Sequence, residues 1–593
     1  MPKTTLRNSL LTLASLVAFQ TPALAQEGTA QKSQELHRII DAYWAYSLEQ
    51  SPVLASSLGV DEYADQVSDV SLEAADKRVE TAKGWLKELD AIDQDALSEN
   101  DKTNFGVLYR SLAESVEANS YGQRTINFTN RSGWHQSFAS MQNNLPFRTE
   151  GDYKSYIARL KQYPEINRQS IAVANQAIAG GYVLPCVSMV GYETSISGLI
   201  TDEPEDSRFY QPFKRPKPDM MDRATFERLA GEAETVISTV IRPELEEHLN
   251  WYESRYVPNC AKDPGVSAQP GGDAYYAFRI RQMTTTDKTA DEIHNIGLSE
   301  VARIRSEMVE VAKSAGYDSR EAFIEHLRTD PQYYAKTPEE LMEKVARITK
   351  IIDGKMPEII GKLARLPYGL KEIPAETAEG TTTAYYNPGS PDVGIAGFYY
   401  VNTSKLDQRP FWEIPALSVH EAVPGHHMQI ALQQELDMPD FRKYGAFFTA
   451  FVEGWGLYSE RLGIEMNLYD TPAKDMGRLS YEMWRACRLV VDTGLHAKGW
   501  TKQQAIDYMT DNTALSPANI EAEVNRYISW PGQALAYKMG ELKIRELRQK
   551  ATTELGDRFD LREFHDVVLG QGAVPLDILE AQVNRWIARE SDS

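Results

Sequence analysis

The sequence has 593 residues, of which 42% are hydrophobic and 25% are charged, as in an ordinary globular protein. Its formal charge of −22 argues against nucleic acid as a partner, because phosphate backbones attract basic surfaces. A chain of this length holds one large domain or a few small ones and can bury a large core.

The first 25 residues are typical of a secretory signal peptide. A positively charged start precedes the apolar run of residues 10–19, and the small residues Ala23 and Ala25 form a cleavage site. The run is too short to span a membrane, and no cysteine follows the cleavage site to carry a lipid. We therefore expect cleavage after Ala25, a periplasmic or secreted location, and no membrane insertion of the mature chain. An uncleaved anchor is the alternative.

Most of the mature chain has helical periodicity, with apolar residues three and four positions apart and charged residues between them. The clearest segments are residues 31–50, 71–96, 103–120, 222–252, 290–315 and 337–365. We predict a mainly α-helical protein, with one large domain over residues 26–593. This domain is either undivided or formed by two lobes, 26–280 and 281–593, around a cleft.

Three cysteines lie far apart in the sequence, at Cys186, Cys260 and Cys487. They lack the C-x-x-C spacing of a metal cluster. In an oxidising compartment Cys186 and Cys260 either pair, leaving Cys487 in an apolar helix-like segment, or all three remain free buried thiols.

Residues 380–403, GTTTAYYNPGSPDVGIAGFYYVNT, differ from the helical segments around them. They are rich in Thr, Tyr, Val and Gly and contain a Pro-Gly-Ser-Pro turn, which predicts a β-hairpin or a pair of edge strands. The segment lies just upstream of a histidine cluster. We therefore expect a small sheet beside the candidate site, where an extended peptide could pair as an added strand.

The segment 417-LSVHEAVPGHHMQIALQQEL-436 holds three of the ten histidines. The zinc motif H-E-x-x-H places two histidines four residues apart on one helix face, whereas His420 and His426 are six apart. An unbroken helix would separate them by about 600°, at about 100° per residue. Because Pro424 and Gly425 disturb a helix, we predict a bulge that absorbs about two residues and brings both histidines to one metal. The alternative is a hydrogen-bonded polar core.

A third ligand is expected in 450-AFVEGWGLYSERLG-463. Glu453 lies in an apolar helix-like segment beside Gly454 and Gly456, and such small residues let helices approach closely. Glu460, by contrast, is expected to be a solvated surface glutamate.

Two histidines and one glutamate with a fourth position open to water form a catalytic type of zinc site. The candidate ligands of one Zn²⁺ per chain are therefore His420, His426 and Glu453. Glu421 would be the general base that takes a proton from the attacking water.

The motifs HEAVPGHHMQ, FVEGWGLYSERL, WRACRLVVDTGLHAKGWT and RYISWPGQALAYKMGEL resemble the bacterial family known as domain of unknown function 885, over most of the mature chain. The site is also similar to that of the gluzincins, helical zinc peptidases that carry H-E-x-G-H. This resemblance implies a gluzincin-like fold and peptidase activity, with His426 as the second ligand. The two inserted residues leave His427 as an alternative ligand.

Helical zinc peptidases commonly use a tyrosine or a histidine from a later helix to stabilise the oxyanion. The candidates for this catalytic role are His496, Tyr527 and Tyr537. Asp492, four residues before His496, could orient that histidine on a shared helix face. The alternative for all three is an ordinary structural role.

Four basic residues are candidate anchors for the terminal carboxylate of a peptide: Arg485, Arg488, Arg526 and Lys538. The guanidinium fork matches a carboxylate, although most arginines form surface ion pairs instead.

These observations together predict an exported zinc-dependent hydrolase that cleaves short peptides. Two alternatives are a metal-dependent hydrolase of non-peptide amides or esters and a non-catalytic periplasmic binding protein with a degenerate site. The sequence leaves open the oligomeric state, the metal in vivo, and whether peptides are trimmed from one end or cut internally.

Overall fold

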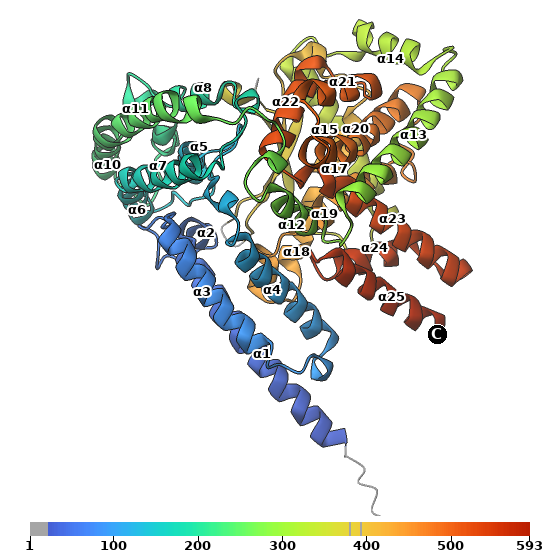
Figure 1. Ribbon diagram of the computed structural model, residues 1–593, viewed down its shortest axis with the longest axis horizontal. Helices are drawn as coiled ribbons and strands as arrows, with labels where there is room; N and C mark the ends of the chain where they lie inside the picture. The colour runs from blue at the N-terminus through green and yellow to red at the C-terminus, as the bar shows by residue number, and fades with distance from the viewer. Residues whose placement is uncertain (1–21, 379–380, 392–393, 593) are drawn as a thin grey trace, which may run out of the picture.

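The structure is a computed structural model that describes residues 22–378, 381–391 and 394–592. It is mainly helical with one small sheet, as the sequence predicted (Figure 1). Residues 1–21, most of the predicted signal peptide, lie outside the described residues. Cleavage after Ala25 therefore stays a prediction.

Each segment with helical periodicity contains at least one helix. The helices up to residue 251 are α1 (Pro22–Gln50), α2 (Pro52–Ser57), α3 (Leu72–Leu89), α4 (Glu99–Ala118), α5 (Trp134–Ser140), α6 (Glu150–Leu160), α7 (Tyr163–Gly180), α8 (Tyr192–Ser197), α9 (Gln211–Lys214), α10 (Arg223–Val236) and α11 (Arg242–Trp251). The later helices are α12 (Gly272–Thr284), α13 (Ala290–Ser314), α14 (Arg320–Thr329), α15 (Pro338–Ile359), α16 (Ala375–Ala378), α17 (Ile414–Glu421), α18 (His426–Glu435), α19 (Thr449–Leu462), α20 (Pro472–Ala497), α21 (Lys502–Asn512), α22 (Pro517–Ser529), α23 (Ala536–Leu555), α24 (Leu561–Leu569) and α25 (Leu576–Asp592).

The sheet has three strands, β1 (Tyr368–Glu372), β2 (Ala384–Asn387) and β3 (Gly397–Val401), in the order β1-β3-β2. β2 and β3 pair antiparallel, with Tyr386 opposite Tyr399, which confirms the predicted hairpin. β1 adds a parallel strand to the other edge of β3 and was not predicted. β2 contacts α17 and β3 contacts α18, so the sheet lies beside the helices that carry the histidine cluster.

Three large hydrophobic clusters organise the helices. α1, α3 and α4 share a core with α18, α19 and α23–α25, while the helices α5–α11 surround an aromatic-rich core of their own. A third core lies among α13–α15 and α20–α22. Figure 1 shows the α5–α11 group on one side and the α13–α15 and α20–α22 group on the other. The first core joins residues from both sides of position 280, and the division into two lobes there stays a prediction.

The cysteines follow the first of the two alternatives. A disulfide bond joins Cys186 to Cys260, and Cys487 is a buried free thiol within α20. Within the described residues, no helix combines the length and the apolar character that crossing a membrane requires.

Candidate metal centre

The link between α17 and α18 carries the two histidines. Residues 422–425 interrupt the helix that we predicted to continue through a bulge. The Gly425 N–H donates a 2.9 Å hydrogen bond to the Val419 carbonyl, six residues back rather than the usual four. The link thereby accommodates the two extra residues, and the ring centroids of His420 and His426 lie 4.7 Å apart.

Two contacts hold this link in shape. A Cβ atom at Gly425 would lie 1.9 Å from the backbone oxygen of His420, so only glycine fits there. The indole N–H of Trp455 donates a 2.7 Å hydrogen bond to the carbonyl of Pro424. The Pro-Gly pair is therefore part of a shaped backbone turn that α19 supports from the side.

α19 brings Glu453 to the histidines by close packing, as its small residues predicted. A Cβ atom on Gly454 would lie 2.5 Å from the Cα of Gly540 in α23, and one on Gly456 would lie 2.8 Å from the ring of His420. Larger residues at either position would push α19 away from its neighbours. These two glycines thus set the distance between Glu453 and the two histidines.

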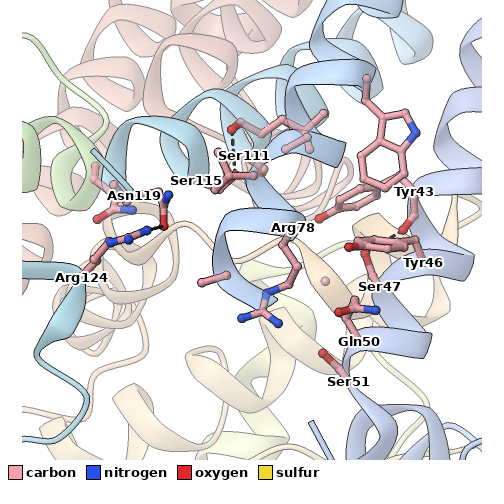
Figure 2. Close-up of a pocket in the computed structure, with 18 of the residues that line it drawn as sticks. Tyr43, Tyr46, Ser47, Gln50, Ser51, Arg78, Ser111, Ser115, Asn119 and Arg124 are labelled. Atoms are coloured by element: carbon pink, nitrogen blue, oxygen red, sulfur yellow. Dashed lines mark hydrogen bonds between the residues drawn. The ribbon is translucent and has the colours of Figure 1, made fainter. Parts of the chain in front are cut away.

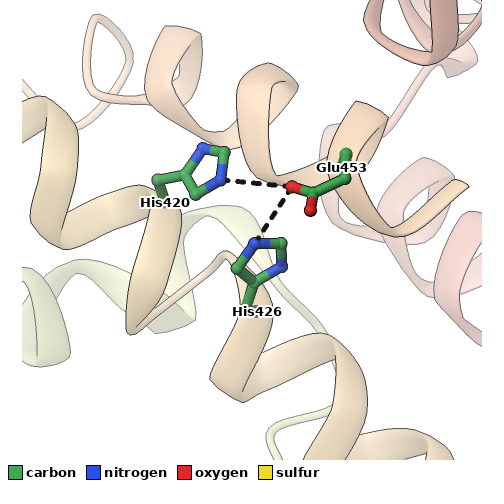
Figure 3. A group of neighbouring side chains, drawn as sticks. All are labelled: His420, His426 and Glu453. Atoms are coloured by element: carbon green, nitrogen blue, oxygen red, sulfur yellow. Dashed lines mark ion pairs between the residues drawn. The ribbon is translucent and has the colours of Figure 1, made fainter. Parts of the chain in front are cut away.

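The side chains of His420, His426 and Glu453 converge on one point (Figure 3). Glu453 Oε2 lies 3.6 Å from His420 Nε2 and 3.3 Å from His426 Nε2, and the candidate donor atoms all lie within 4.8 Å of one another. Ligands about 2.0–2.1 Å from a tetrahedral zinc ion are separated by about 3.3 Å. Glu453 Oε2 is buried and has no hydrogen-bond partner among the described residues, so a metal ion would satisfy it. The donor set therefore fits zinc.

The Glu460 carboxylate contacts His420 on the ring nitrogen that does not face Glu453. Its Oε1 lies 2.9 Å from His420 Nδ1, and Arg485 Nη2 lies 3.2 Å from the same oxygen. The residue is 1% exposed, so the prediction of a solvated surface glutamate is wrong. Burial alone would lower the pKa of His420, but the neighbouring carboxylates of Glu453 and Glu460 outweigh burial and raise that pKa to about 10. The carboxylate behind the imidazole turns Nε2 toward the candidate metal position.

Replacing Glu460 with glutamine should lower zinc affinity about 10–100-fold, because the oriented carboxylate behind a ligand histidine is lost. Competition with a zinc chelator of known affinity measures the change. Glu465→Gln, at an exposed position just after α19, is the control and should leave the affinity unchanged. Equal affinities of the Glu460 variant and the wild type would contradict this role.

His427, the alternative ligand, points elsewhere. Its Nε2 lies 2.9 Å from the Leu366 carbonyl and must carry the proton, so Nδ1 accepts a 2.9 Å hydrogen bond from the Tyr386 hydroxyl. Burial lowers the pKa of His427 to about 4, so the ring is neutral near pH 7. With both nitrogens engaged, His427 has none left for a metal, which leaves His426 as the second candidate ligand.

The predicted base, Glu421, directly follows His420 at the end of α17. Its side chain is 8% exposed and makes no hydrogen bond or ion pair with any other described residue. A carboxylate without a protein partner beside a candidate metal position is available to a water molecule.

Among the predicted oxyanion donors, Tyr537 has a ring contact with the candidate metal centre in the described part of the chain. Its ring stacks near that of His420, with centroids 6.5 Å apart. Its hydroxyl accepts hydrogen bonds of 3.0 Å from Arg526 and 3.4 Å from Gln533. Because neither contact uses the hydroxyl hydrogen, Tyr537 can still donate.

The structure does not support the catalytic roles predicted for His496 and Tyr527. The Val266 N–H donates to His496 Nδ1, and His496 Nε2 donates to the Tyr527 carbonyl, so neither nitrogen is free. Asp492 accepts from the Tyr276 hydroxyl rather than orienting His496. The Tyr527 hydroxyl accepts from Trp484 and Arg488, the residue is 1% exposed, and within the described residues its ring, unlike that of Tyr537, contacts neither His420 nor His426. Both residues hold helices together.

Two of the predicted carboxylate anchors are also occupied. Lys538 is fully buried, and its Nζ lies 2.9 Å from carboxylate oxygens of Glu300, Glu482 and Glu541. A fourth carboxylate would meet repulsion there rather than a free cation. Arg485 pairs with Glu460 and therefore supports the carboxylate that contacts His420 Nδ1. Arg488 and Arg526 lie near Tyr537, with their guanidinium carbons 4.4 and 6.0 Å from its ring centroid.

A large cavity lies apart from the metal centre. It has a volume of about 700 Å³ and is lined by α1, α3, α4 and α12, with aromatic residues such as Tyr43 and hydroxyl groups such as those of Ser47 and Ser111 (Figure 2). Its lining does not include the three candidate metal ligands. The structure therefore gives this cavity no part in the chemistry of the histidine cluster.

Fold and site together define a mainly helical protein with a candidate metal centre of two histidines and one glutamate. The chain belongs to the family described as "Bacterial protein of unknown function (DUF885)", whose model matches residues 52–583. This finding confirms the family resemblance, whereas the likeness to gluzincins stays a prediction. No curated protein matches the sequence.

Two solved structures have the same fold. The first, described as "The crystal structure of the putative lipoprotein from Colwellia psychrerythraea", is 29% identical, has a TM-score of 0.86, and matches over 95% of this chain and 99% of its own. The second, described as a "putative lipoprotein of unknown function from Shewanella oneidensis", is 17% identical, has a TM-score of 0.68, and matches over 92% and 99%. The second similarity, at 17% identity, is evidence for the fold alone.

Proposed function

We propose that this protein is an exported zinc-dependent hydrolase that cleaves short peptides. The observation that carries the proposal is the Glu453 carboxylate, whose buried Oε2 faces two histidine Nε2 atoms without a hydrogen-bond partner among the described residues. The unpartnered Glu421 beside it favours catalysis over metal storage, because a site that only binds metal has no need of that carboxylate.

The N-terminal sequence and the relatives support export. The signal-like leader agrees with the two similar structures, both described as putative lipoproteins. Here Gln26 follows the expected cleavage site where a lipoprotein would need a cysteine. We therefore propose a periplasmic or secreted protein.

The side chains of the site suggest a division of roles. A zinc ion held by His420, His426 and Glu453 would polarise the substrate carbonyl and acidify the attacking water. Glu421 accepts the proton of that water and later delivers it to the released amine. The hydroxyl of Tyr537 donates to the oxyanion that develops on the carbonyl oxygen. The same roles are found in gluzincins, which the motif resembles.

Cleavage products identify the reaction class. The mature protein, loaded with one equivalent of zinc, should hydrolyse short peptides, and chelation should abolish cleavage until zinc is returned. A matched panel of acyl-amides and esters tests the first alternative, and cleavage confined to that panel would replace the peptidase proposal. Peptide binding without any cleavage by the zinc-loaded protein would favour the binding-protein alternative.

A further inference from the structure

Three arginines surround one glutamate beside the candidate metal centre. Glu523 Oε2 lies 2.9 Å from Arg488 Nη2, and its Oε1 lies 3.6 Å from Arg526 Nη1 and 3.8 Å from Arg131 Nη1. Arg488 and Arg526 come from α20 and α22, whereas Arg131 comes from the tight turn before α5. We call Arg131, Arg488 and Arg526 the arginine cluster.

The arginine cluster has more positive charge than its surroundings neutralise. Among the described residues, Glu523 is the only carboxylate paired with any of the three, which leaves an excess of two formal charges. Burial opposes the charged form of Glu523, but the attraction of the three guanidinium groups outweighs burial and lowers its pKa to about 2. Glu523 is thus ionised near pH 7 and cannot serve as a further proton source.

Several guanidinium donors of the arginine cluster are not used. Arg488 is 2% exposed, yet its Nη1 has no hydrogen-bond partner among the described residues. Arg131 lies at an exposed position, and its guanidinium makes no hydrogen bond within the described part of the chain. A buried charged donor without a partner, such as Arg488 Nη1, is costly, so this arrangement indicates that an anion completes it. Lys538, by contrast, already faces three carboxylates.

Tyr537 connects the arginine cluster to the metal centre. Its ring lies 6.5 Å from that of His420 and 4.4 Å from the guanidinium carbon of Arg488, and its hydroxyl accepts from Arg526. An anion at the arginine cluster would therefore lie within a short peptide's length of the candidate metal position, since each extended residue spans about 3.3–3.6 Å.

We infer that the arginine cluster binds the C-terminal carboxylate of the substrate, which makes the protein a carboxypeptidase. This inference rests on the proposed peptide hydrolysis. The guanidinium fork matches a carboxylate through paired hydrogen bonds. Water adds to the carbonyl carbon, the C–N bond breaks, and the released C-terminal fragment takes the proton that Glu421 accepted. The reaction needs no other reactant.

Two peptides that differ only in a free carboxylate or an amide at the C-terminus test this inference. Their binding is measured by calorimetry on zinc-loaded Glu421→Gln, and their products are identified by mass spectrometry with the wild type. The free acid should bind about tenfold or more tightly than the amide, because the hydrogen bonds to its charge are lost in the amide. Products should appear from the carboxyl end.

Arg131→Gln is the main variant, because Arg131 lies in a turn and its loss spares the buried Arg488–Glu523 pair. It should raise KM for the free acid about tenfold, change kcat little, and leave binding of the amide unchanged. Arg562→Gln, at an exposed position on α24, is the matched control, and thermal unfolding checks that both variants fold.

The outcomes separate the two proposals. Equal binding and cleavage of acid and amide, products from the amino end, or an unaltered KM in a folded Arg131 variant would overturn the carboxylate site and leave the peptidase proposal standing. If the zinc-loaded protein neither binds nor cleaves either peptide, both proposals fail.

Discussion

Replacing Glu421 with glutamine is expected to lower peptide turnover about 10²–10⁴-fold, the usual contribution of a positioned general base. Glutamine has nearly the same shape but cannot accept the proton of the attacking water at neutral pH. Because Glu421 makes no hydrogen bond or ion pair with another described residue, its loss should disturb neither the fold nor the three candidate ligands. Steady-state kinetics on a short peptide and elemental analysis of bound zinc measure both effects.

The matched control is Glu465→Gln, which makes the same chemical change at an exposed site outside the centre. It should retain both turnover and zinc. Full activity of the Glu421 variant would contradict the proposed mechanism, whereas loss of zinc together with activity would mean that Glu421 is needed for metal binding. Only low turnover with zinc retained fits a general base.

Local patterns were sufficient to predict the helices and the three candidate ligands. Histidine and glutamate in apolar segments are unusual enough to indicate a candidate site, and the glycines beside Glu453 predict the close helix packing that the structure shows. The hairpin followed from β-branched and aromatic residues around a turn. β1 was missed because its pairing with β3 depends on a parallel contact that bridges a long connection.

The supporting residues were harder to predict, because their roles depend on distant partners. Glu460 lies seven residues after Glu453, two helical turns along the same face, and this spacing could have indicated that both point toward the histidines. Lys538 and His496 have no comparable local signal. The groups that already bind these two side chains come from other elements of the fold, such as Glu300 in α13 for Lys538.

The role proposed for Arg131 in substrate binding also depends on distant partners. It lies in a turn before α5, and nothing in that local sequence distinguishes it from a surface arginine. Only the fold brings it to Glu523 in α22, almost 400 residues later in the chain. The arginine cluster, unlike the candidate metal centre, is therefore a product of long-range packing that sequence periodicity does not report.

Replacing His420 with alanine is expected to reduce bound zinc from about one per chain to a small fraction, and His426→Ala should do the same. Each change removes one of the three candidate protein ligands and leaves Glu453 with a single imidazole partner. The loss of affinity should exceed the 10–100-fold expected for Glu460→Gln, because a ligand matters more than the group that orients it. Elemental analysis after dialysis against excess zinc measures the difference.

His427→Ala is the sharpest control, since it removes an imidazole from the residue next to His426. Both nitrogens of His427 already bind Tyr386 and Leu366, so this variant should keep its zinc even if the loss of those hydrogen bonds lowers its stability. If His427→Ala loses its zinc and His426→Ala keeps it, the assignment of His426 as the second ligand is overturned. The expected result is that, of the three histidine variants, His427→Ala alone keeps its zinc. That result would mean that the turn at Pro424 and Gly425 is an insertion of two residues within a working metal site, because this turn brings His420 and His426 together.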